Sequence, residues 1–323
     1  MRLLVTGGAG FIGSNFVRRV HDQTLNGISS VIVLDKMTYA GVQENLDGVI
    51  GHGNYSLVVG DICDGNLVSS LLSEIDAVIN FAAESHVDRS IGSAAEFVET
   101  NVGGVQVLLD AIKASGRNIR FVQVSTDEVY GSIESGSWTE EWPLQPNSPY
   151  SASKAGGELL ARAYYKTHGL DVVITRCSNN YGTHHFPEKL IPLFVTNLLE
   201  GKKVPVYGNG KNVRDWLHVD DHCRGIHKVL MNGRAGEVYN IGGGRELNNL
   251  EITSLILEAM GKDESSIEYV EDRKGHDLRY SVDWTKINRE LGYEPQVKFE
   301  DGLRDTIQWY RDNESWWKPL KSR

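Results

Sequence analysis

The sequence predicts an α/β protein with a doubly wound parallel sheet and a second, smaller α/β domain that is discontinuous along the chain. Short apolar runs that read as buried strands alternate with segments of helical periodicity. The first strand-like run is followed at once by closely spaced glycines, and each later run stops at a polar or small-residue loop. This alternation is typical of parallel strands joined by helices, whose loops gather along one edge of the sheet.

The first strand is expected over residues 3–6, and a helix is expected over about 14–20. The turn between them fits both the spacing G-x-G-x-x-G and the wider spacing G-x-x-G-x-x-G. Glycine lets backbone N–H groups close on a pyrophosphate at the helix N-terminus, where the helix dipole favours negative charge. Strand, glycine turn and helix form the context of a dinucleotide fingerprint, so a Rossmann-like domain is predicted. The glycines concerned are Gly7, Gly8, Gly10 and Gly13.

A second strand, expected over 31–34, ends in Asp35. An acidic residue about 20 positions after the glycine turn accepts hydrogen bonds from ribose hydroxyls and repels a 2′-phosphate. NAD is therefore favoured over NADP as the cofactor. Lys36 is the only nearby residue that favours the phosphorylated form.

Further strands are expected over 57–59 and 77–81. After the second of these, Ala82 and Ala83 are small enough for a flat cofactor to lie against the backbone, although tight helix–sheet packing explains them equally well. Between 95 and 114 apolar residues recur at helical spacing, which indicates a core or interface helix.

Two adjacent carboxyl residues, Asp127 and Glu128, follow a strand expected over 119–124. Ligands of open α/β sheets bind at this edge. Successive strand residues point to opposite faces, so the pair can serve one ligand only if the chain has left strand geometry there. Held in different environments, two carboxyls can act as an acid and a base. The alternative is a solvated acidic turn.

Tyr150 and Lys154 lie four residues apart on a helix expected to begin at Pro149, with Ser148 as its N-cap. A nearby ammonium favours the phenolate, so a lowered pKa is expected for the tyrosine, which could then act as a base. The base would take a proton from a sugar or alcohol hydroxyl of the substrate, and the hydroxyl of Thr126 could orient that substrate oxygen. The alternative is a surface pair without a catalytic role.

Composition excludes several classes of protein. The 323 residues suggest about two domains. A net charge of -10 argues against binding to nucleic acid or to an anionic membrane. The three cysteines lack a C-x-x-C motif, which fits a reducing cytoplasm better than disulfides or zinc. The ten histidines lack metal-binding spacing, so no metal is expected and His184-His185 is placed on a surface loop. No apolar run suits a signal peptide or a membrane span.

Four motifs run through the chain: TGGAGFIG at 6–13, FAAESHVDRS at 81–90, STDEVYG at 125–131 and YSASK at 150–154. They resemble the extended short-chain dehydrogenase/reductase family, and within it the nucleotide-sugar dehydratases that act on dTDP-glucose. The likeness covers nearly the whole chain. It departs at Thr183, where many members have a proline, in a loop that borders the substrate site.

The resemblance implies one reaction in one pocket. Tyr150, kept ionised by Lys154, would take the proton of the hexose C4 hydroxyl as hydride passes to NAD, with Thr126 oriented at the same oxygen. Glu128 would then remove the C5 proton while a protonated Asp127 donates to the departing C6 hydroxyl, and hydride would return to C6. Burial beside Glu128 should raise the pKa of Asp127.

The resemblance also implies which residues surround the ligands. The catalytic residues would be Thr126, Asp127, Glu128, Tyr150 and Lys154. The residues that hold NAD would be Gly7, Gly10, Phe11, Ile12, Gly13, Asp35, Lys36, Thr38, Asp61, Ile62, Phe81, Ala82, Ala83, Ser85, Thr100, Ser125, Tyr150, Lys154, Cys177 and Asn180. The residues that hold the nucleotide sugar would be Ser85, Thr126, Asn179, Lys189, Leu190, Pro205, Tyr207, Arg214, Asn249, His276 and Tyr280.

Arg214 suits a diphosphate because its planar fork donates two hydrogen bonds to phosphate oxygens. An interdomain or surface salt bridge is the alternative. The cofactor domain is expected to cover 1–178 with a return segment of about 215–242, and the nucleotide-sugar domain to cover 179–214 and 243–323.

Amphipathic helices over 250–260 and 302–311 are expected to cover the second domain, and Trp316-Trp317 is expected to pack rather than to react. The resemblance further implies a homodimer that pairs through helices at about 95–114 and 150–168, with Gly156-Gly157 allowing close helix approach.

Three other functions remain open. A nucleotide-sugar 4-epimerase would share the glycine turn and the tyrosine but would need no acid at C6. A dehydratase for another nucleotide sugar, or a decarboxylase of a nucleotide-linked glucuronate, would keep Glu128 but would usually lack the preceding Asp. A binding protein without activity on the same scaffold is the third.

Overall fold

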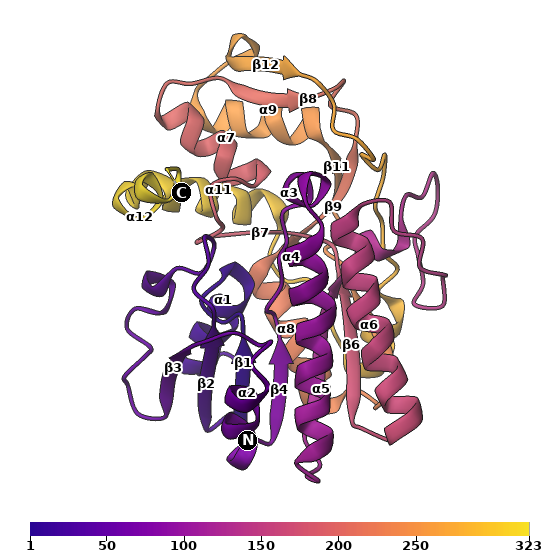
Figure 1. The fold of residues 1–323 in the computed structure, drawn as a ribbon. Coiled ribbons are helices and arrows are strands. Elements are labelled where there is room, and N and C mark those ends of the chain that lie inside the picture. The colour runs from indigo at the N-terminus through magenta and orange to yellow at the C-terminus, as the bar shows by residue number, and fades with distance from the viewer. Residues whose placement is uncertain (323) are drawn as a thin grey trace.

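A seven-stranded sheet forms the larger lobe of the computed structural model, which describes residues 1–322 (Figure 1). Its strands are β1 Arg2–Thr6, β2 Ser30–Asp35, β3 Tyr55–Val59, β4 Ala77–Asn80, β5 Arg120–Thr126, β6 Val172–Cys177 and β10 Val238–Ile241. All neighbours pair in parallel, in the order β10-β6-β5-β4-β1-β2-β3. The order reverses between β1 and β4, and open α/β sheets bind ligands at the carboxyl edge beside such a point. The predicted doubly wound parallel sheet is confirmed.

The two faces of this sheet bury alternate residues of the same strands. Leu3 and Val5 pack on one face and Leu4 packs on the other, as the two-residue period of a strand requires. The helices that contribute to the first face are α1 Phe11–His21, α8 Val219–Asn232 and α10 Thr285–Leu291. Those that contribute to the second are α2 Gly65–Leu71, α5 Val105–Ala114 and α6 Pro149–His168.

The capping signals in the sequence predict the start of α6 correctly, but the predicted start of α1 is too late. Ser148 caps α6 and forms a capping box with Ser151, and Gly169 ends the helix in the left-handed conformation. Helix α1 begins at Phe11, earlier than the predicted start at Ser14, because the helix follows directly on the glycine turn.

The predicted helix over 95–114 is interrupted by a π-helical turn, Glu99–Gly104, which joins α4 Ala95–Val98 to α5. Asn101 in this turn is buried, and its side-chain amide donates to the Glu84 carbonyl at 3.0 Å and to the Ser153 hydroxyl at 2.9 Å. Such turns are frequent at functional sites. Hydrophobic periodicity alone could not reveal this one.

The smaller lobe contains two small sheets and several helices (Figure 1). One sheet is formed by β7 Asn179–Tyr181, β9 Val213–His218 and β11 Glu246–Asn248, and the other by β8 Val204–Tyr207 and β12 Ile267–Val270. Its helices are α7 Leu190–Leu199, α9 Asn249–Met260, α11 Phe299–Asp312 and α12 Glu314–Leu320. The other short helices of the chain are α3 Val87–Gly92 and the 3₁₀ helices η1 Gln43–Leu46, η2 Leu72–Glu74, η4 Asp127–Tyr130 and η5 Glu264–Ser266.

A separate apolar core fills the smaller lobe and includes Trp216, Ile252 and Trp317. The predicted helices over 250–260 and 302–311 correspond to α9 and α11, and the packing role expected of Trp317 is confirmed because this side chain is fully buried. No helix within residues 1–322 combines the length and the apolar character needed to cross a membrane.

The division of the chain into domains remains a proposal, which the two cores support and refine. Within the expected return segment, α8 and β10 pack on the larger sheet. Ile287 and Tyr293 also lie in the core of the larger lobe, although the sequence placed them in the second domain. We therefore propose that α10 and Tyr293 belong with the larger lobe.

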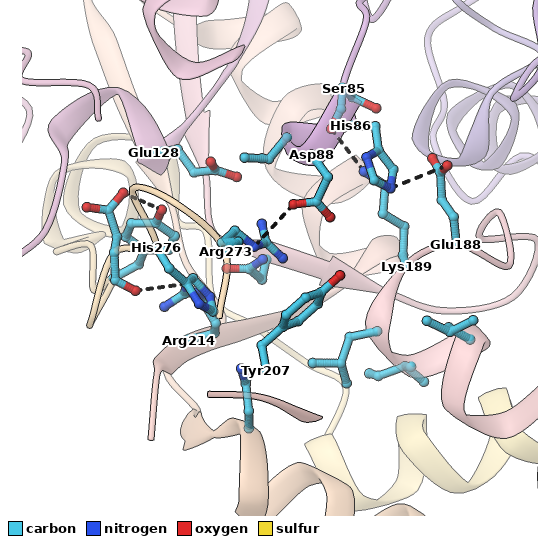
Figure 2. Close-up of a pocket in the computed structure, with 18 of the residues that line it drawn as sticks. Ser85, His86, Asp88, Glu128, Glu188, Lys189, Tyr207, Arg214, Arg273 and His276 are labelled. Carbon is cyan, nitrogen blue, oxygen red and sulfur yellow. Dashed lines mark hydrogen bonds and ion pairs between the residues drawn. The ribbon is translucent and has the colours of Figure 1, made fainter. Parts of the chain in front are cut away.

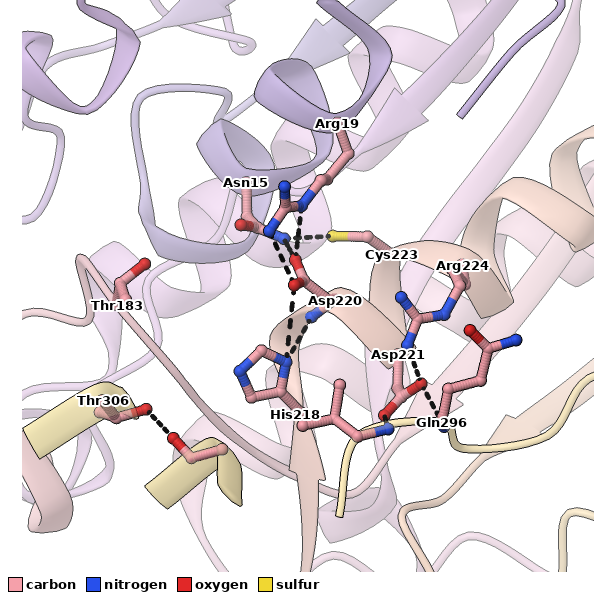
Figure 3. Close-up of polar contacts among 12 residues, drawn as sticks. Asn15, Arg19, Thr183, His218, Asp220, Asp221, Cys223, Arg224, Gln296 and Thr306 are labelled. Atoms are coloured by element: carbon pink, nitrogen blue, oxygen red, sulfur yellow. Dashed lines mark hydrogen bonds and ion pairs between the residues drawn. The ribbon is translucent and has the colours of Figure 1, made fainter. Parts of the chain in front are cut away.

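A polar junction behind the glycine turn joins α1 to the start of α8 (Figure 3). Asp220 accepts hydrogen bonds from Arg19 Nε at 2.8 Å and from Asn15 Nδ2 at 2.9 Å. The next residue, Asp221, accepts from the backbone N–H groups of Gln296 at 2.7 Å and Val297 at 3.0 Å, in the segment that leads into α11. The first turn of α8 therefore binds both α1 and the segment that leads into α11.

Candidate active site

Two adjoining cavities open at the carboxyl edge of the larger sheet. The glycine-turn cavity, of about 310 Å³, is lined by the turn after β1 and by the ends of β2 and β5. The lobe cavity, of about 300 Å³, extends into the smaller lobe. Two ligands in contact with each other could therefore occupy the two cavities, because the cavities share part of their lining. The seven shared residues are Ser85, Glu128, Asn179, Asn180, His185, Glu188 and Lys189.

The glycine turn has no room for side chains at its two ends. Gly7 has a φ of +67°, and a Cβ on it would lie 2.5 Å from the backbone nitrogen of Ala82. A Cβ on Gly13 would lie 2.3 Å from the Gly7 carbonyl oxygen. Gly7, Gly10 and Gly13 line the cavity, whereas Gly8 is buried against Val33, so the wider of the two spacings describes the cradle. Since α1 begins here, the cradle suits a pyrophosphate.

Asp35 lies at the end of β2 with 8% of its surface exposed. Its carboxylate accepts from the backbone N–H groups of Ala9 at 2.9 Å and Met37 at 2.8 Å, which fixes the acid against the glycine turn. Lys36 pairs with Asp61 at 2.6 Å. The one basic residue that favoured a 2′-phosphate is therefore already partnered by a carboxylate.

Every residue predicted to hold the cofactor lines the glycine-turn cavity. Three buried oxygens in this region, Ser125 Oγ, Asp127 Oδ2 and Asn179 Oδ1, have no hydrogen-bond partner among residues 1–322 and are available to a ligand. Besides the glycines, Asp35, Lys36, Asp61 and Ser125, the predicted cofactor residues that line this cavity are Phe11, Ile12, Thr38, Ile62, Phe81, Ala82, Ala83, Ser85, Thr100, Tyr150, Lys154, Cys177 and Asn180.

Asp127 and Glu128 are the first two residues of η4, so the chain has left strand geometry where the pair stands. Asp127 is 2% exposed, accepts from the Thr126 hydroxyl at 3.2 Å through Oδ1, and has no partner for Oδ2 among the described residues. Burial, then the charges of Glu128 and Asp215, raise the pKa of Asp127 well above its usual value. The alternative of a solvated acidic turn is wrong, and the predicted direction of the pKa is confirmed.

Glu128 lies where the two cavities meet. The pKa of its carboxyl is raised, because burial outweighs the opposing effect of Arg214, Lys189 and Arg273. The two neighbouring carboxyls therefore have different environments: Asp127 faces mainly negative charge and Glu128 faces three cations. This contrast can separate an acid from a base.

The environment of Tyr150 corrects one expectation. Burial, then the charge of Glu128, raise the pKa of the Tyr150 phenol well above its usual value, although the Thr126 side chain acts in the opposite direction. Lys154 donates to the Val124 carbonyl at 2.7 Å, and burial lowers the pKa of its ammonium to about 8. The predicted lowering of the phenol pKa is therefore wrong for the protein without ligands, since helical spacing says nothing about burial.

Three cations stand on the lobe side of Glu128 (Figure 2). Arg214 donates to the carbonyls of Val213 at 2.8 Å and Asp277 at 3.0 Å, and its guanidinium lies 4.1 Å from the centre of the Tyr280 ring. It forms no ion pair with residues 1–322, so the salt-bridge alternative is wrong. Packed on Tyr280 and held by two carbonyls, the Arg214 guanidinium is placed to bind a phosphate.

Lys189 and Arg273 are the other two cations. Lys189 donates to the Ser85 carbonyl at 2.9 Å, and Arg273 lies 3.5 Å from Asp88 (Figure 2). Sequence reasoning missed both Arg273 and Asp88. Asp88 stands inside one of the recognised motifs, and Arg273 closely precedes Gly275, so a search for charges beside these motifs would have found them.

The predicted nucleotide-sugar residues line the lobe cavity, except that Thr126 lines only the glycine-turn cavity. His276 pairs with Asp272 at 2.6 Å, and the Tyr280 hydroxyl donates to Asp277 at 2.7 Å, so both aromatic side chains are held in place. The others that line the lobe cavity are Ser85, Asn179, Lys189, Leu190, Pro205, Tyr207, Arg214 and Asn249.

The pair His184-His185 does not lie on a surface loop as expected. His185 stacks on Phe11 with ring centroids 4.0 Å apart, and burial lowers the pKa of His185 well below its usual value. His184 packs on Trp309 at 4.3 Å. The prediction was wrong because the partners of this segment come from distant parts of the chain.

Comparison with known proteins identifies the relatives of this chain. A family profile described as GDP-mannose 4,6 dehydratase matches residues 4–306. The chain is 60% identical over 325 residues to the dTDP-glucose 4,6-dehydratase of Streptomyces niveus, a match that covers 100% of this chain and 96% of that protein.

Solved structures agree. DesIV, a dTDP-glucose 4,6-dehydratase from Streptomyces venezuelae crystallised with NAD, matches with a TM-score of 0.98 and 60% identity over 99% of this chain and 100% of that chain. UDP-glucose 4-epimerase from Thermotoga maritima, crystallised with UDP-glucose, matches with a TM-score of 0.89 and 31% identity over 97% of this chain and 100% of that chain. Because a dehydratase and an epimerase share this fold, the residues of the cavities must distinguish them.

Proposed function

The chain belongs to the GDP-mannose 4,6 dehydratase family, and we propose that within it the protein is an NAD-dependent dTDP-glucose 4,6-dehydratase. It converts dTDP-glucose into dTDP-4-keto-6-deoxyglucose and water. The observation that carries this proposal is the buried pair Asp127-Glu128 beside Tyr150 in one pocket, because only a dehydration at C5 and C6 needs both an acid and a base there.

The two carboxyls receive their roles from their environments. Asp127, kept protonated by burial and by negative neighbours, is the acid that donates to the departing C6 hydroxyl. Glu128, which faces Arg214, Lys189 and Arg273, is the base that removes the C5 proton. Opposite surroundings at adjacent positions let both groups act in one turnover.

Tyr150 is the base for the C4 hydroxyl, and the Thr126 hydroxyl orients the same oxygen. Bound NAD supplies the reversible hydride acceptor and a positive charge that, with Lys154, favours the ionised phenol. The residues that would hold NAD are those of the glycine turn together with Asp35, whose carboxylate is already fixed for ribose. The net reaction consumes no cofactor.

The diphosphate of the substrate is assigned to the lobe cavity. Arg214 has no carboxylate partner among residues 1–322, and Lys189 is positioned by the Ser85 carbonyl. Charge-assisted hydrogen bonds from such groups are strong and directional. Glu128 is then near the sugar end of the cavity and the thymidine extends toward Tyr207.

A nucleotide-sugar 4-epimerase is the second candidate, because the epimerase of Thermotoga maritima shares the fold. An epimerase has no use for a proton donor at C6, whereas Asp127 presents a buried carboxyl oxygen with no partner among residues 1–322. This difference favours the dehydratase.

Incubation of the purified protein with dTDP-glucose, without added NAD, should yield a product lighter by one water. In heavy water, the product should carry deuterium at C5, because Glu128 removes that hydrogen and solvent replaces it. Mass spectrometry measures both results. Formation of the 4-epimer without loss of mass would contradict the proposal, and UDP-glucose in place of dTDP-glucose tests the preference for thymidine.

We further propose that the protein is a homodimer that pairs through α4, α5 and α6. Val98 is 53% exposed and Leu159 is 52% exposed, on helices that lie side by side (Figure 1). The close helix approach expected at Gly156-Gly157 occurs within the chain, because a Cβ on Gly157 would lie 2.2 Å from the Asn101 carbonyl oxygen, so these glycines already serve packing inside one subunit. Exposed apolar side chains therefore support the dimer.

Light scattering at micromolar concentration should give about twice the chain mass of 35.9 kDa. Leu159→Glu should shift this mass toward that of one chain, because a charge would be buried without a partner in the interface. A wild-type mass of one chain would contradict the dimer and leave the proposed activity unaffected.

A further inference from the structure

The C-terminal helix α12 lies against the loop that follows Asp35. Val42 from this loop, Phe186 from the smaller lobe and Leu320 from α12 form a buried apolar cluster, on which Tyr39 and Trp316 also pack. The loop, residues 36–46, supplies Lys36, Thr38, Ala40 and Gly41 to the wall of the glycine-turn cavity. One wall of that cavity is thus supported from behind by the end of the chain.

A chain of hydrogen bonds connects α12 to the glycine turn through Asn45. The indole N–H of Trp316 donates to Asn45 Oδ1 at 3.0 Å. Asn45 Nδ2 donates to the Ala9 carbonyl at 2.9 Å, and the Ala9 N–H donates to Asp35 at 2.9 Å. Arg18 donates to the Asn45 carbonyl at 2.7 Å. Asn45 is only 2% exposed, so no water can readily replace Trp316 as its partner.

The far side of the loop is held by Phe186 of the smaller lobe and by Arg89 of α3. The Tyr39 ring meets Phe186 edge-on with centroids 5.4 Å apart, and the Arg89 guanidinium lies 3.7 Å from the centre of the Tyr39 ring. Phe186 directly follows His185, which stacks on Phe11 at the start of α1. The loop is therefore fixed at Tyr39 by aromatic packing and at Asn45 by the bond from Trp316.

Neither Trp316 nor Asn45 lines either cavity. Both can act on the cofactor only through the loop that walls it, so they are positioning residues. We propose that α12 is a clasp: through the Trp316–Asn45 hydrogen bond it keeps loop 36–46 closed over the glycine-turn cavity and slows the release of NAD. This inference rests on the proposed function in taking NAD as the cofactor.

Slow release of NAD is important for the proposed reaction. Hydride must return to the same sugar from which it came, so cofactor release during turnover would strand the reaction. A site that retains NAD needs its wall to open rarely, and local opening is rare where buried hydrogen bonds and apolar contacts hold a segment. The clasp supplies both from a helix remote from the chemistry.

Release of NAD tests the clasp directly and requires no turnover. The protein is loaded with radiolabelled NAD, unlabelled NAD is added in excess, and the loss of label is followed in time. Trp316→Phe should release NAD about tenfold faster than the wild type, because it leaves the buried Asn45 oxygen without a donor. Added NAD should restore turnover of the variant, and the KM for dTDP-glucose should not change.

Trp309→Phe is the matched control. Trp309 lies in the same aromatic cluster, 5.0 Å from Trp316, and its indole N–H donates to no residue of the described chain. It should therefore release NAD at the wild-type rate. Asn45→Ala should also speed release, and adding Trp316→Phe to it should change nothing further, since the two residues act through one bond.

The possible results distinguish failure of the clasp from failure of the proposed function. Equal release rates for the wild type, Trp316→Phe and Trp309→Phe would overturn the clasp and leave the proposed function intact. A further acceleration when Trp316→Phe is added to Asn45→Ala would also overturn it. A wild-type protein that binds no NAD would contradict the proposed function itself. If Asn45→Ala does not fold, the comparison of the two tryptophan variants still decides.

Discussion

Replacement of Tyr150 by Phe should lower the turnover of dTDP-glucose by about 10²–10⁴-fold, the range typical of a lost general base. The variant keeps the ring, which is 9% exposed and packs 6.4 Å from Phe97, so the fold should be unaffected. Among the described residues, Tyr150 is the one that places a phenol in the cavity beside Thr126, and the variant removes it. Since the 4-ketone precedes every later step, neither loss of water nor deuterium at C5 should be detected at the wild-type rate.

Tyr165→Phe is the control for this experiment. Tyr165 lies on the same helix but away from both cavities, so its variant should keep wild-type activity. Rapid incorporation of deuterium at C5 by Tyr150→Phe would contradict the assigned base. In the wild type, the rate should rise with pH until the phenol is ionised, because burial and Glu128 raise the pKa of Tyr150.

Much of the larger lobe could be predicted because its signals are local. Strands buried on both faces appear as apolar runs, and the start of α6 is given by Ser148 and Pro149, which directly precede Tyr150. The glycine turn could be recognised for the same reason. The choice between its two spacings could not, since it depends on Val33, which fills the space beside Gly8.

The part of the site that could be predicted is formed by reactive residues that are adjacent in the sequence. Asp127 and Glu128 could be assigned different roles from their adjacency and from the resemblance, and their surroundings are consistent with those roles. What failed depended on burial. The pKa of Tyr150 and the donation of Lys154 to Val124 follow from the depth of the pocket, which helical spacing does not encode.

Contacts between distant segments were beyond sequence reasoning altogether. His185 meets Phe11, and Trp316 meets Asn45, across most of the chain. Each of these residues is unremarkable in its own segment: a histidine pair without metal spacing, and a tryptophan near the end of the chain. Only the fold gives them partners, and those partners support the cofactor wall.

Replacement of Asp127 by Asn should slow the loss of water by about 10²–10³-fold while leaving the earlier steps in place. Asparagine has the same shape and keeps a hydrogen-bond donor, but it carries no proton that can pass to the C6 hydroxyl. Burial, Glu128 and Asp215 keep that proton on the wild-type residue. Recovered dTDP-glucose from a reaction in heavy water should therefore carry deuterium at C5, because Glu128 still removes that hydrogen.

Glu128→Gln is the variant that makes this experiment decisive. It removes the base and leaves Asp127, so recovered substrate should carry no deuterium at C5 and no water should be lost. The pH dependence should differ as well: an acid acts below its pKa, so the wild-type rate should fall as Asp127 loses its proton, and Asp127→Asn should lack that fall. Since burial raises the pKa of Asp127 well above the usual value, the loss occurs at a higher pH than for an exposed carboxyl. Unimpaired loss of water in Asp127→Asn would show that Asp127 is not the acid. The proton for the C6 hydroxyl would then come from the substrate or from solvent.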